Sequence, residues 1–174
     1  MTSPETRRPD PSEHLDYYGK YIALVPEGDL LAQLEEQMKE TQGLLRGLPE
    51  ERAMFRYGPD KWSIKEVVGH LIDAERIFAY RALRFSRNDA TPLPGFEEND
   101  YVRNADFDRR TLASLLDEWE QARRTTVLFF RNLSDEAWDR RGTANDAAMS
   151  VRAAAWVIAG HERHHRGILR ERYL

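Results

Sequence analysis

Four separate stretches of this chain repeat their apolar residues every three or four positions, which is the period of an α-helix with one buried face. The stretches cover about residues 30–46, 63–85, 109–130 and 150–172. We find no internal repeat and no convincing strand, and residues 142–149 are predicted to be a loop. At 174 residues the chain fits a single domain with a sizeable core. The sequence therefore predicts an all-α protein built as a four-helix bundle.

Local signals mark the ends of these helices. Asp29 precedes the first helix and can cap it, and Gly47 and Pro49 end it. Ser63 and Glu66 have the spacing of a capping box at the start of the second helix. These signals support the helix boundaries that the apolar period suggests.

A long connection, residues 88–108, separates the second helix from the third. A connection of that length in a compact bundle is more often a lid or a binding loop than inert filler. We expect part of it to shape the mouth of a pocket, and a packed surface loop is the equal alternative. The residues concerned are Phe96, Glu97, Glu98, Asn99 and Tyr101.

The two ends of the chain and its composition limit the remaining possibilities. Residues 1–12 are rich in proline and polar side chains and are predicted to be a flexible tail, leaving 13–174 as the domain. No signal peptide and no apolar run of about 18–20 residues is present, so we expect a cytoplasmic protein with no membrane partner. The chain has no cysteine, so any metal must be held by histidine, carboxylate, backbone or water.

Three histidines fall on faces that should be buried. His161 and His165 are four residues apart, which places them about 40° apart on one helix face. His70 lies on the apolar face of the second helix. Each could be a hydrogen-bonded core residue, but three inward imidazoles all need partners, and one metal ion supplies them at once. Gly69 and Gly160, which precede two of these histidines, are expected to let a neighbouring backbone approach closely.

Three neutral nitrogen ligands would leave coordination positions open for water or substrate. Zinc or nickel suits imidazole ligands, and iron or manganese is also possible. Asp73, three residues after His70, is a candidate catalytic residue that could orient a ligand or act on a metal-bound water. An aspartate paired with a surface arginine is an equal alternative. Glu75 and Glu162 are interpreted as surface charges.

The order and spacing of several motifs resembles the DinB/YfiT superfamily over nearly the whole chain. These motifs are Tyr21-Ile22 and Leu24 to Asp29 before the first helix, Lys61 to Glu66 leading into Gly69-His70-Leu71 with Asp73 and Glu75, and the closing Gly160 to His165. The resemblance implies an up-down-down-up bundle, often dimeric, with a divalent metal, commonly nickel or zinc, on His70, His161 and His165. Relatives include thiol-dependent transferases and isomerases that use bacillithiol or mycothiol, and proteins labelled metal-dependent hydrolases.

Two classes of function remain open. The first is an enzyme whose metal activates a low-molecular-weight thiol, as in an S-transferase, or a water molecule, as in a hydrolase, against a small-molecule substrate. The alternative is a non-catalytic metal-binding stress or interaction protein, and a homodimer fits either class. No nucleic-acid partner is expected, because the net charge is −4 and the arginines of the fourth helix are more simply a solvated face. Those arginines are Arg163, Arg166, Arg170 and Arg172.

Overall fold

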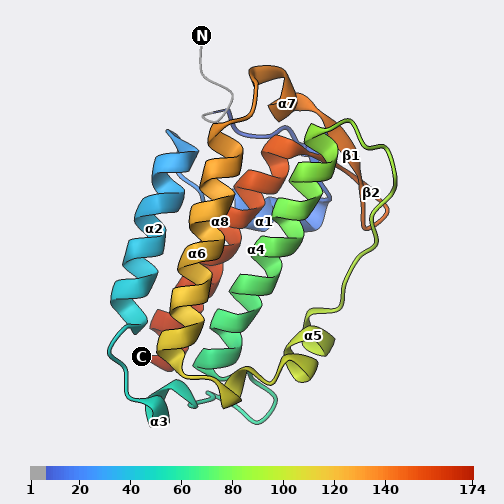
Figure 1. Cartoon of the computed structure of the whole chain (residues 1–174). Helices are drawn as coiled ribbons and strands as arrows, with labels where there is room; N and C mark the ends of the chain where they lie inside the picture. The colour runs from blue at the N-terminus through green and yellow to red at the C-terminus, as the bar shows by residue number, and fades with distance from the viewer. Residues whose placement is uncertain (1–6) are drawn as a thin grey trace.

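A computed structural model describes residues 7–174 of the chain. Its helices and strands are α1 (Asp16–Ile22), α2 (Leu30–Leu45), α3 (Glu50–Ala53), α4 (Ile64–Ser86), α5 (Glu98–Ala105), α6 (Leu112–Arg131), α7 (Asp135–Asp139), β1 (Arg141–Ala144), β2 (Ala147–Ser150) and α8 (Val151–Ile168). Short 3-10 turns lie at Pro11–Glu13 and Phe107–Arg109, and a π-helical turn follows α8 at Leu169–Tyr173. The four long helices α2, α4, α6 and α8 form the bundle in Figure 1. The predicted four-helix bundle is confirmed.

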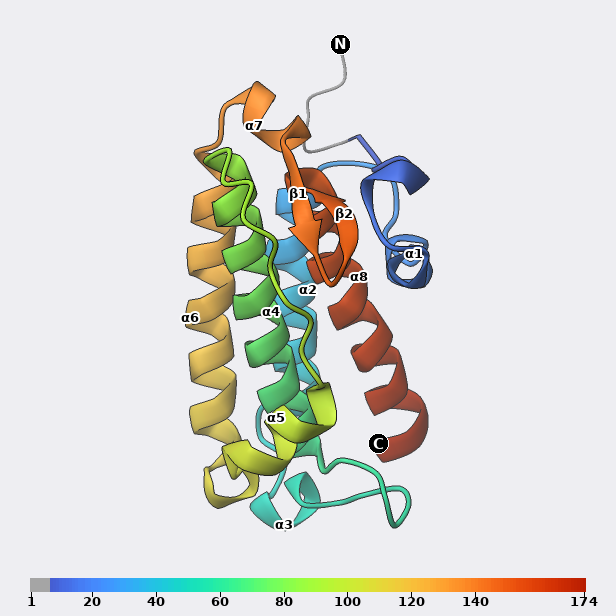
Figure 2. The same ribbon diagram turned by 90° about the vertical axis from the view of Figure 1, so that its right-hand side faces the viewer.

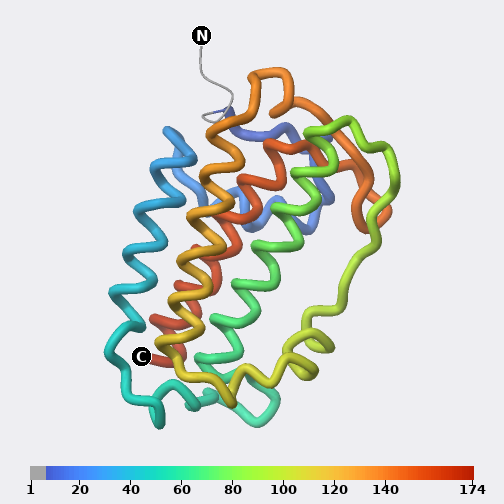
Figure 3. Tube along the Cα trace, viewed as in Figure 1, coloured from blue at the N-terminus to red at the C-terminus, as the bar shows by residue number. Residues whose placement is uncertain are grey.

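The order of helix directions is what sets this bundle apart from a simple up-and-down one. Figure 3 shows that α2 and α8 run one way and that α4 and α6 run the other way. α4 packs against both α6 and α8, and α2 closes the bundle by packing against the same two helices. Because α4 and α6 are parallel neighbours, the chain that connects the end of α4 to the start of α6 must run back along the whole length of the bundle.

That return is the long connection that the sequence predicted. The 23 residues of α4 extend about 34 Å, so a short loop cannot join its end to the start of α6. Figure 2 shows the connection running down one side of the bundle and carrying α5 near its lower end. The crossover therefore has a topological reason to be long, and it places α5 beside α4.

The predicted loop at 142–149 is wrong, because these residues form most of a β-hairpin. β1 and β2 pair antiparallel, with Gly142 opposite Met149 and Ala144 opposite Ala147. Asn145 and Asp146 both have positive φ, 54° and 58°, as the two central residues of a tight hairpin turn do. Each strand has only four residues, mostly small ones, so no alternating apolar pattern announced them.

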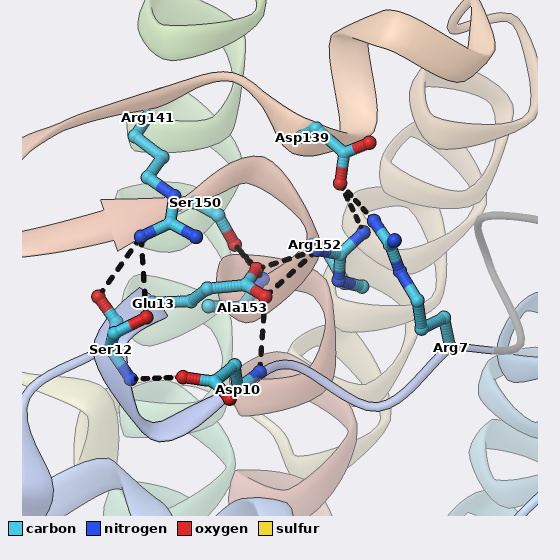
Figure 4. Close-up of polar contacts among 9 residues, drawn as sticks. All are labelled: Arg7, Asp10, Ser12, Glu13, Asp139, Arg141, Ser150, Arg152 and Ala153. Atoms are coloured by element: carbon cyan, nitrogen blue, oxygen red, sulfur yellow. Dashed lines mark hydrogen bonds and ion pairs between the residues drawn. The ribbon is translucent and has the colours of Figure 1, made fainter.

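The N-terminal residues lie against the bundle from Arg7 onward. Arg8 donates hydrogen bonds to the carbonyl oxygens of Ile22 and Val25, both at 2.7 Å. Figure 4 shows Glu13 accepting hydrogen bonds from Ser150 and Arg152. Residues 7–12 of the predicted tail therefore make contacts with the domain that composition does not reveal. The flexibility of the tail stays a prediction, and residues 1–6 lie outside the described part of the chain.

The core consists of two apolar clusters with a polar layer between them. One cluster surrounds Trp156 and Phe85, and the other surrounds Trp119 and Leu116. The layer between them is made of buried polar side chains from all four long helices. They are Gln37 and Thr41 of α2, Glu75 of α4, Arg123 of α6 and Glu162 of α8. The histidines of α4 and α8 lie at nearly the same level.

Candidate metal centre

The structure brings His70, His161 and His165 together. Their ligand atoms all lie within 4.8 Å of one another. Nε2 of His161 lies 2.9 Å from Nε2 of His70 and 3.1 Å from Nε2 of His165. α4 supplies the first and α8 the other two, so the tight packing of these two helices creates the cluster. His164, which immediately precedes His165 in the sequence, lies outside the cluster, and its ring is edge-on to that of Tyr21.

Two glycines allow neighbouring segments to approach the histidine cluster. A Cβ atom at Gly160 would overlap the backbone of Tyr21, so α1 can cross α8 at this point only over a glycine. A Cβ atom at Gly69 would overlap the ring of Phe107 from the crossover. The expected approach of a neighbouring backbone is confirmed at Gly160 and is wrong at Gly69, where the neighbour is the side chain of Phe107.

Burial keeps all three imidazoles neutral at physiological pH. Burial, aided by His164, lowers the pKa of His70 to about 4. Burial and the neighbouring histidines hold the pKa values of His161 and His165 well below the ordinary 6.5. A metal ion binds the deprotonated ring nitrogen. The cluster is therefore in the protonation state that metal binding requires.

Two of the three separations between the ring nitrogens match those around a bound ion. Two nitrogen atoms held at about 2.0–2.1 Å by one ion lie about 2.9–3.4 Å apart, depending on coordination geometry. The two short separations, 2.9 and 3.1 Å, fall in that range. Direct hydrogen bonding explains the cluster less well, because Nε2 of His161 has either one N–H or one lone pair and can therefore bond to only one of its two neighbours. The residues present fit a divalent metal.

Two sizeable cavities border the histidine cluster. The larger, about 400 Å³, is lined by His70 and His161 together with aromatic side chains of α1 and α4 and residues of the crossover. The smaller, about 250 Å³, is lined by His165 and Trp62. Glu98 lines both, and one of its carboxylate oxygens lies 3.8 Å from Nε2 of His70.

Four of the five crossover residues predicted to shape a pocket line one of the two cavities. Phe96, Glu97 and Glu98 line the larger cavity, Asn99 lines the smaller one, and Tyr101 packs on Phe96. Burial and the charge of Glu97 raise the pKa of Glu98, and Lys20 opposes the shift. Sequence reasoning placed Glu98 in the mouth but did not place it beside a histidine, because that contact depends on where α5 lies.

The structure does not bring Asp73 to the histidine cluster. Asp73 is half-buried, and burial raises its pKa. The charged groups near it are Arg76 and Glu118, on the side of α4 that faces α6. Its catalytic role stays a prediction, and Glu98 is the carboxylate that lies beside a histidine.

The interpretation of Glu75 and Glu162 as surface charges is wrong. Their exposed fractions are 3% and 1%, and both pair with Arg123, which is 1% exposed. Buried carboxylates are stable only with such partners. The signal that sequence reasoning missed is Arg123 itself, which stands four residues from Trp119 and from Val127 on the apolar face of α6.

The prediction of a solvated arginine face on the fourth helix is wrong for Arg166. This side chain is buried against Gln37 and Glu40 of α2.

The fold and the site together define a four-helix bundle with parallel neighbouring helices and, between α4 and α8, a histidine cluster that could hold a metal ion. A family profile described as the DinB superfamily matches residues 33–169. The chain belongs to the DinB superfamily.

Two solved structures share this fold. YfiT from Bacillus subtilis, described as a probable metal-dependent hydrolase with an unusual four-helix bundle topology, superposes with a TM-score of 0.71 at 17% identity, covering 95% of this chain and 90% of YfiT. The mycothiol-dependent maleylpyruvate isomerase superposes with a TM-score of 0.68 at 11% identity, covering 84% of this chain and 61% of the isomerase. No curated protein sequence matches the chain. At these identities the likeness concerns the fold alone.

Among the described residues, 7–174, no helix combines the length and the apolar character that crossing a bilayer requires.

Proposed function

We propose that this protein binds one divalent metal ion through His70, His161 and His165 and uses it to activate a small nucleophile against a small-molecule substrate. The observation that carries the proposal is the convergence of three neutral imidazole nitrogens beside a cavity of about 400 Å³. A cavity of that size can hold a small organic molecule. Zinc or nickel suits the nitrogen ligands best.

The metal, when bound, would lower the pKa of a coordinated thiol or water and so supply a nucleophile at neutral pH. The chain's own residues would hold the ion and shape the surroundings of the substrate. Aromatic side chains of α1, α4 and the crossover would exclude water from an apolar part of the substrate. Those side chains are Tyr17, Tyr18, Tyr21, Phe78 and Phe96.

The nucleophile is either water or a low-molecular-weight thiol. The description of YfiT as a metal-dependent hydrolase supports water, and the mycothiol dependence of the isomerase supports a thiol. An S-transferase or a hydrolase is therefore the reaction class that we propose. Asp73 remains a candidate for orienting a ligand, and the homodimer implied by the family resemblance remains a prediction.

The first test is metal content. Protein purified without an affinity tag and loaded with zinc or nickel is expected to hold one ion per chain by elemental analysis. The His70→Ala variant should lose stoichiometric metal, because two ligands on one helix cannot replace three from two helices. His164→Ala is the matched control, since His164 neighbours the ligands but stands outside the cluster, and it should keep one ion.

The second test is turnover. The loaded protein is assayed against an electrophile such as a haloaromatic compound with several low-molecular-weight thiols, and against simple esters and amides without thiol. Metal-dependent turnover of either set, lost in His70→Ala and kept in His164→Ala, supports the proposal and separates its two reaction classes. Metal binding without turnover would favour a non-catalytic metal-binding protein, and absence of metal would overturn the proposal.

A further inference from the structure

The polar layer next to the histidine cluster contains two carboxylates, Glu75 and Glu162, but only one guanidinium, that of Arg123. Glu75 receives two hydrogen bonds from Arg123, at 2.7 and 3.0 Å. Glu162 receives bonds from Arg123 at 2.6 Å, from Thr41 at 2.7 Å and from Gln37. One guanidinium between two buried carboxylates leaves an excess negative charge, and such a charge needs further donors or cations.

Glu75 has fewer partners than Glu162. Both of its hydrogen bonds come from Arg123, whereas three different side chains donate to Glu162. An ionised carboxylate can accept about four hydrogen bonds. Glu75 can therefore accept further hydrogen bonds. Because its exposed fraction is only 3%, bulk water does not supply the donors.

A small cavity lies between Glu75 and His161. Its volume is about 10 Å³, and its charged or titratable lining residues are Glu75, Arg123, His161 and Glu162. Trp119 also lines it, together with the apolar side chains of Leu71, Ala74, Phe78 and Ile158. That volume is about what one water molecule occupies. The indole N–H of Trp119 is fully buried and has no hydrogen-bond partner among residues 7–174.

The second ring nitrogen of His161 takes no part in the histidine cluster. Its Nε2 meets the Nε2 atoms of His70 and His165, so its Nδ1 is directed away from them. His161 is 7% exposed, and it lines the same small cavity as Glu75. A metal-binding histidine is usually oriented by a hydrogen bond from its second nitrogen to a carboxylate, a carbonyl or a water.

We propose that one buried water molecule in this cavity joins His161 to Glu75. The water accepts hydrogen bonds from Nδ1–H of His161 and from the indole N–H of Trp119, and it donates to the carboxylate of Glu75. Three polar partners satisfy a buried water. Glu75 then acts as a positioning residue, which holds His161 in the tautomer whose Nε2 is free to bind a metal.

The proposal deepens the metal-binding function proposed above and rests on it. The excess negative charge of the polar layer would face the metal through the imidazole of His161 and make that ring a stronger ligand. The layer also joins all four long helices, so the orientation of His161 would depend on the packing of the whole bundle.

The test compares three variants in which the fold is checked by thermal unfolding. Glu75→Gln removes the carboxylate charge, and Trp119→Phe removes the indole donor. Trp156→Phe is the matched control, because Trp156 is also fully buried with an unpartnered indole N–H but does not line the cavity. Two readouts are used: the ¹⁵N imidazole spectrum of His161 in metal-free protein at fixed pH, and zinc affinity by competition with a chelator.

In the unmodified protein His161 should be the Nδ1–H tautomer. Glu75→Gln should shift it toward Nε2–H and weaken zinc binding by about tenfold to a hundredfold. Trp119→Phe should move both readouts in the same direction by less, and Trp156→Phe should move neither.

An unchanged His161 spectrum in Glu75→Gln would overturn the proposal, as would equal effects of the two tryptophan variants. If Glu75→Gln does not fold, the tryptophan pair decides alone. Should the unmodified protein bind no zinc, the proposed function fails, but the tautomer measured without metal still decides whether His161 is linked to Glu75.

Discussion

Arg123 is the residue on which the polar layer depends. Its guanidinium contacts Glu75 and Glu162 and also donates to the carbonyl oxygen of Leu34, at 3.0 Å. It therefore links α6 to α4, α8 and α2. Without it, two carboxylates would be buried with no cation beside them, which is among the costliest defects in a protein interior.

Arg123→Ala should lower the free energy of unfolding by about 3–5 kcal/mol, because the carboxylates lose their charge partner. Urea unfolding monitored by circular dichroism measures the change. Arg124→Ala is the control: Arg124 is the next residue, pairs with Glu120 at the surface, and has a side chain that is 59% exposed. Its replacement should cost less than about 1 kcal/mol. Similar losses in the two variants would contradict a structural role for Arg123.

The sequence predicted which histidines lie together but not the charges around them. His70, His161 and His165 could be found because helical spacing places a residue on a face without knowledge of its neighbours. Glu75 and Glu162 were misjudged because their burial depends on Arg123, 48 and 39 residues away. The contact of Glu98 with His70 depends on the path of the crossover, which spacing within one helix does not reveal.

At the scale of elements, α1 forms one wall of the larger cavity by crossing α8 over Gly160. Tyr21 of α1 lies edge-on to His161, with ring centroids 5.3 Å apart. Gly160→Ala should push α1 away, since the added Cβ would overlap backbone, which cannot rotate aside. We expect a loss of about 1–3 kcal/mol of unfolding free energy, as overpacked cores show. Thermal unfolding measures it.

Gly167→Ala is the matched control on the same helix. Nothing lies within 4 Å of a Cβ atom at Gly167, so alanine there only favours the helix. It should raise the unfolding free energy by up to about 1 kcal/mol. If Gly160→Ala stabilised the protein in the same way, α1 would not be held against α8 as the structure shows.

The four long helices could be predicted from the sequence, whereas the two short strands could not. The capping box of Ser63 and Glu66 and the cap at Asp29 are both present, because they are local arrangements. The hairpin of β1 and β2 was missed, since it depends on contacts outside its own sequence. Leu93 of the crossover, for example, donates to the carbonyl of Thr143 and accepts from the backbone N–H of Asn145.

At the scale of the whole molecule, contacts between distant segments fix the arrangement that the helices alone leave open. Amphipathic helices can pack in several orders, and their pattern does not say which neighbours are parallel. The family resemblance implied the observed order, and the long crossover, which the sequence analysis interpreted as a lid or binding loop, is the connection that this order requires. Glu13 provides a second long-range tie, since it joins the N-terminal segment to Ser150 and Arg152 at the start of α8.

This tie should make stability depend on pH. Burial alone would raise the pKa of Glu13, but hydrogen bonds from Ser150 and Arg152 outweigh it and hold the pKa below its ordinary value of 4.5. A carboxyl group with a lowered pKa in the folded state stabilises the protein above its unfolded pKa, and the stabilisation disappears as pH falls through the folded pKa. Glu13→Gln should therefore cost roughly 1–3 kcal/mol at neutral pH.

The same variant should be less sensitive to acid. Between pH of about 5 and about 3 its unfolding free energy should fall less than that of the unmodified protein, so the two curves converge. Urea unfolding across this range measures both curves. Glu51→Gln, at an exposed position of α3, should follow the unmodified protein throughout. Parallel curves for Glu13→Gln and the unmodified protein would show that the contact with Arg152 does not hold the N-terminal segment in solution.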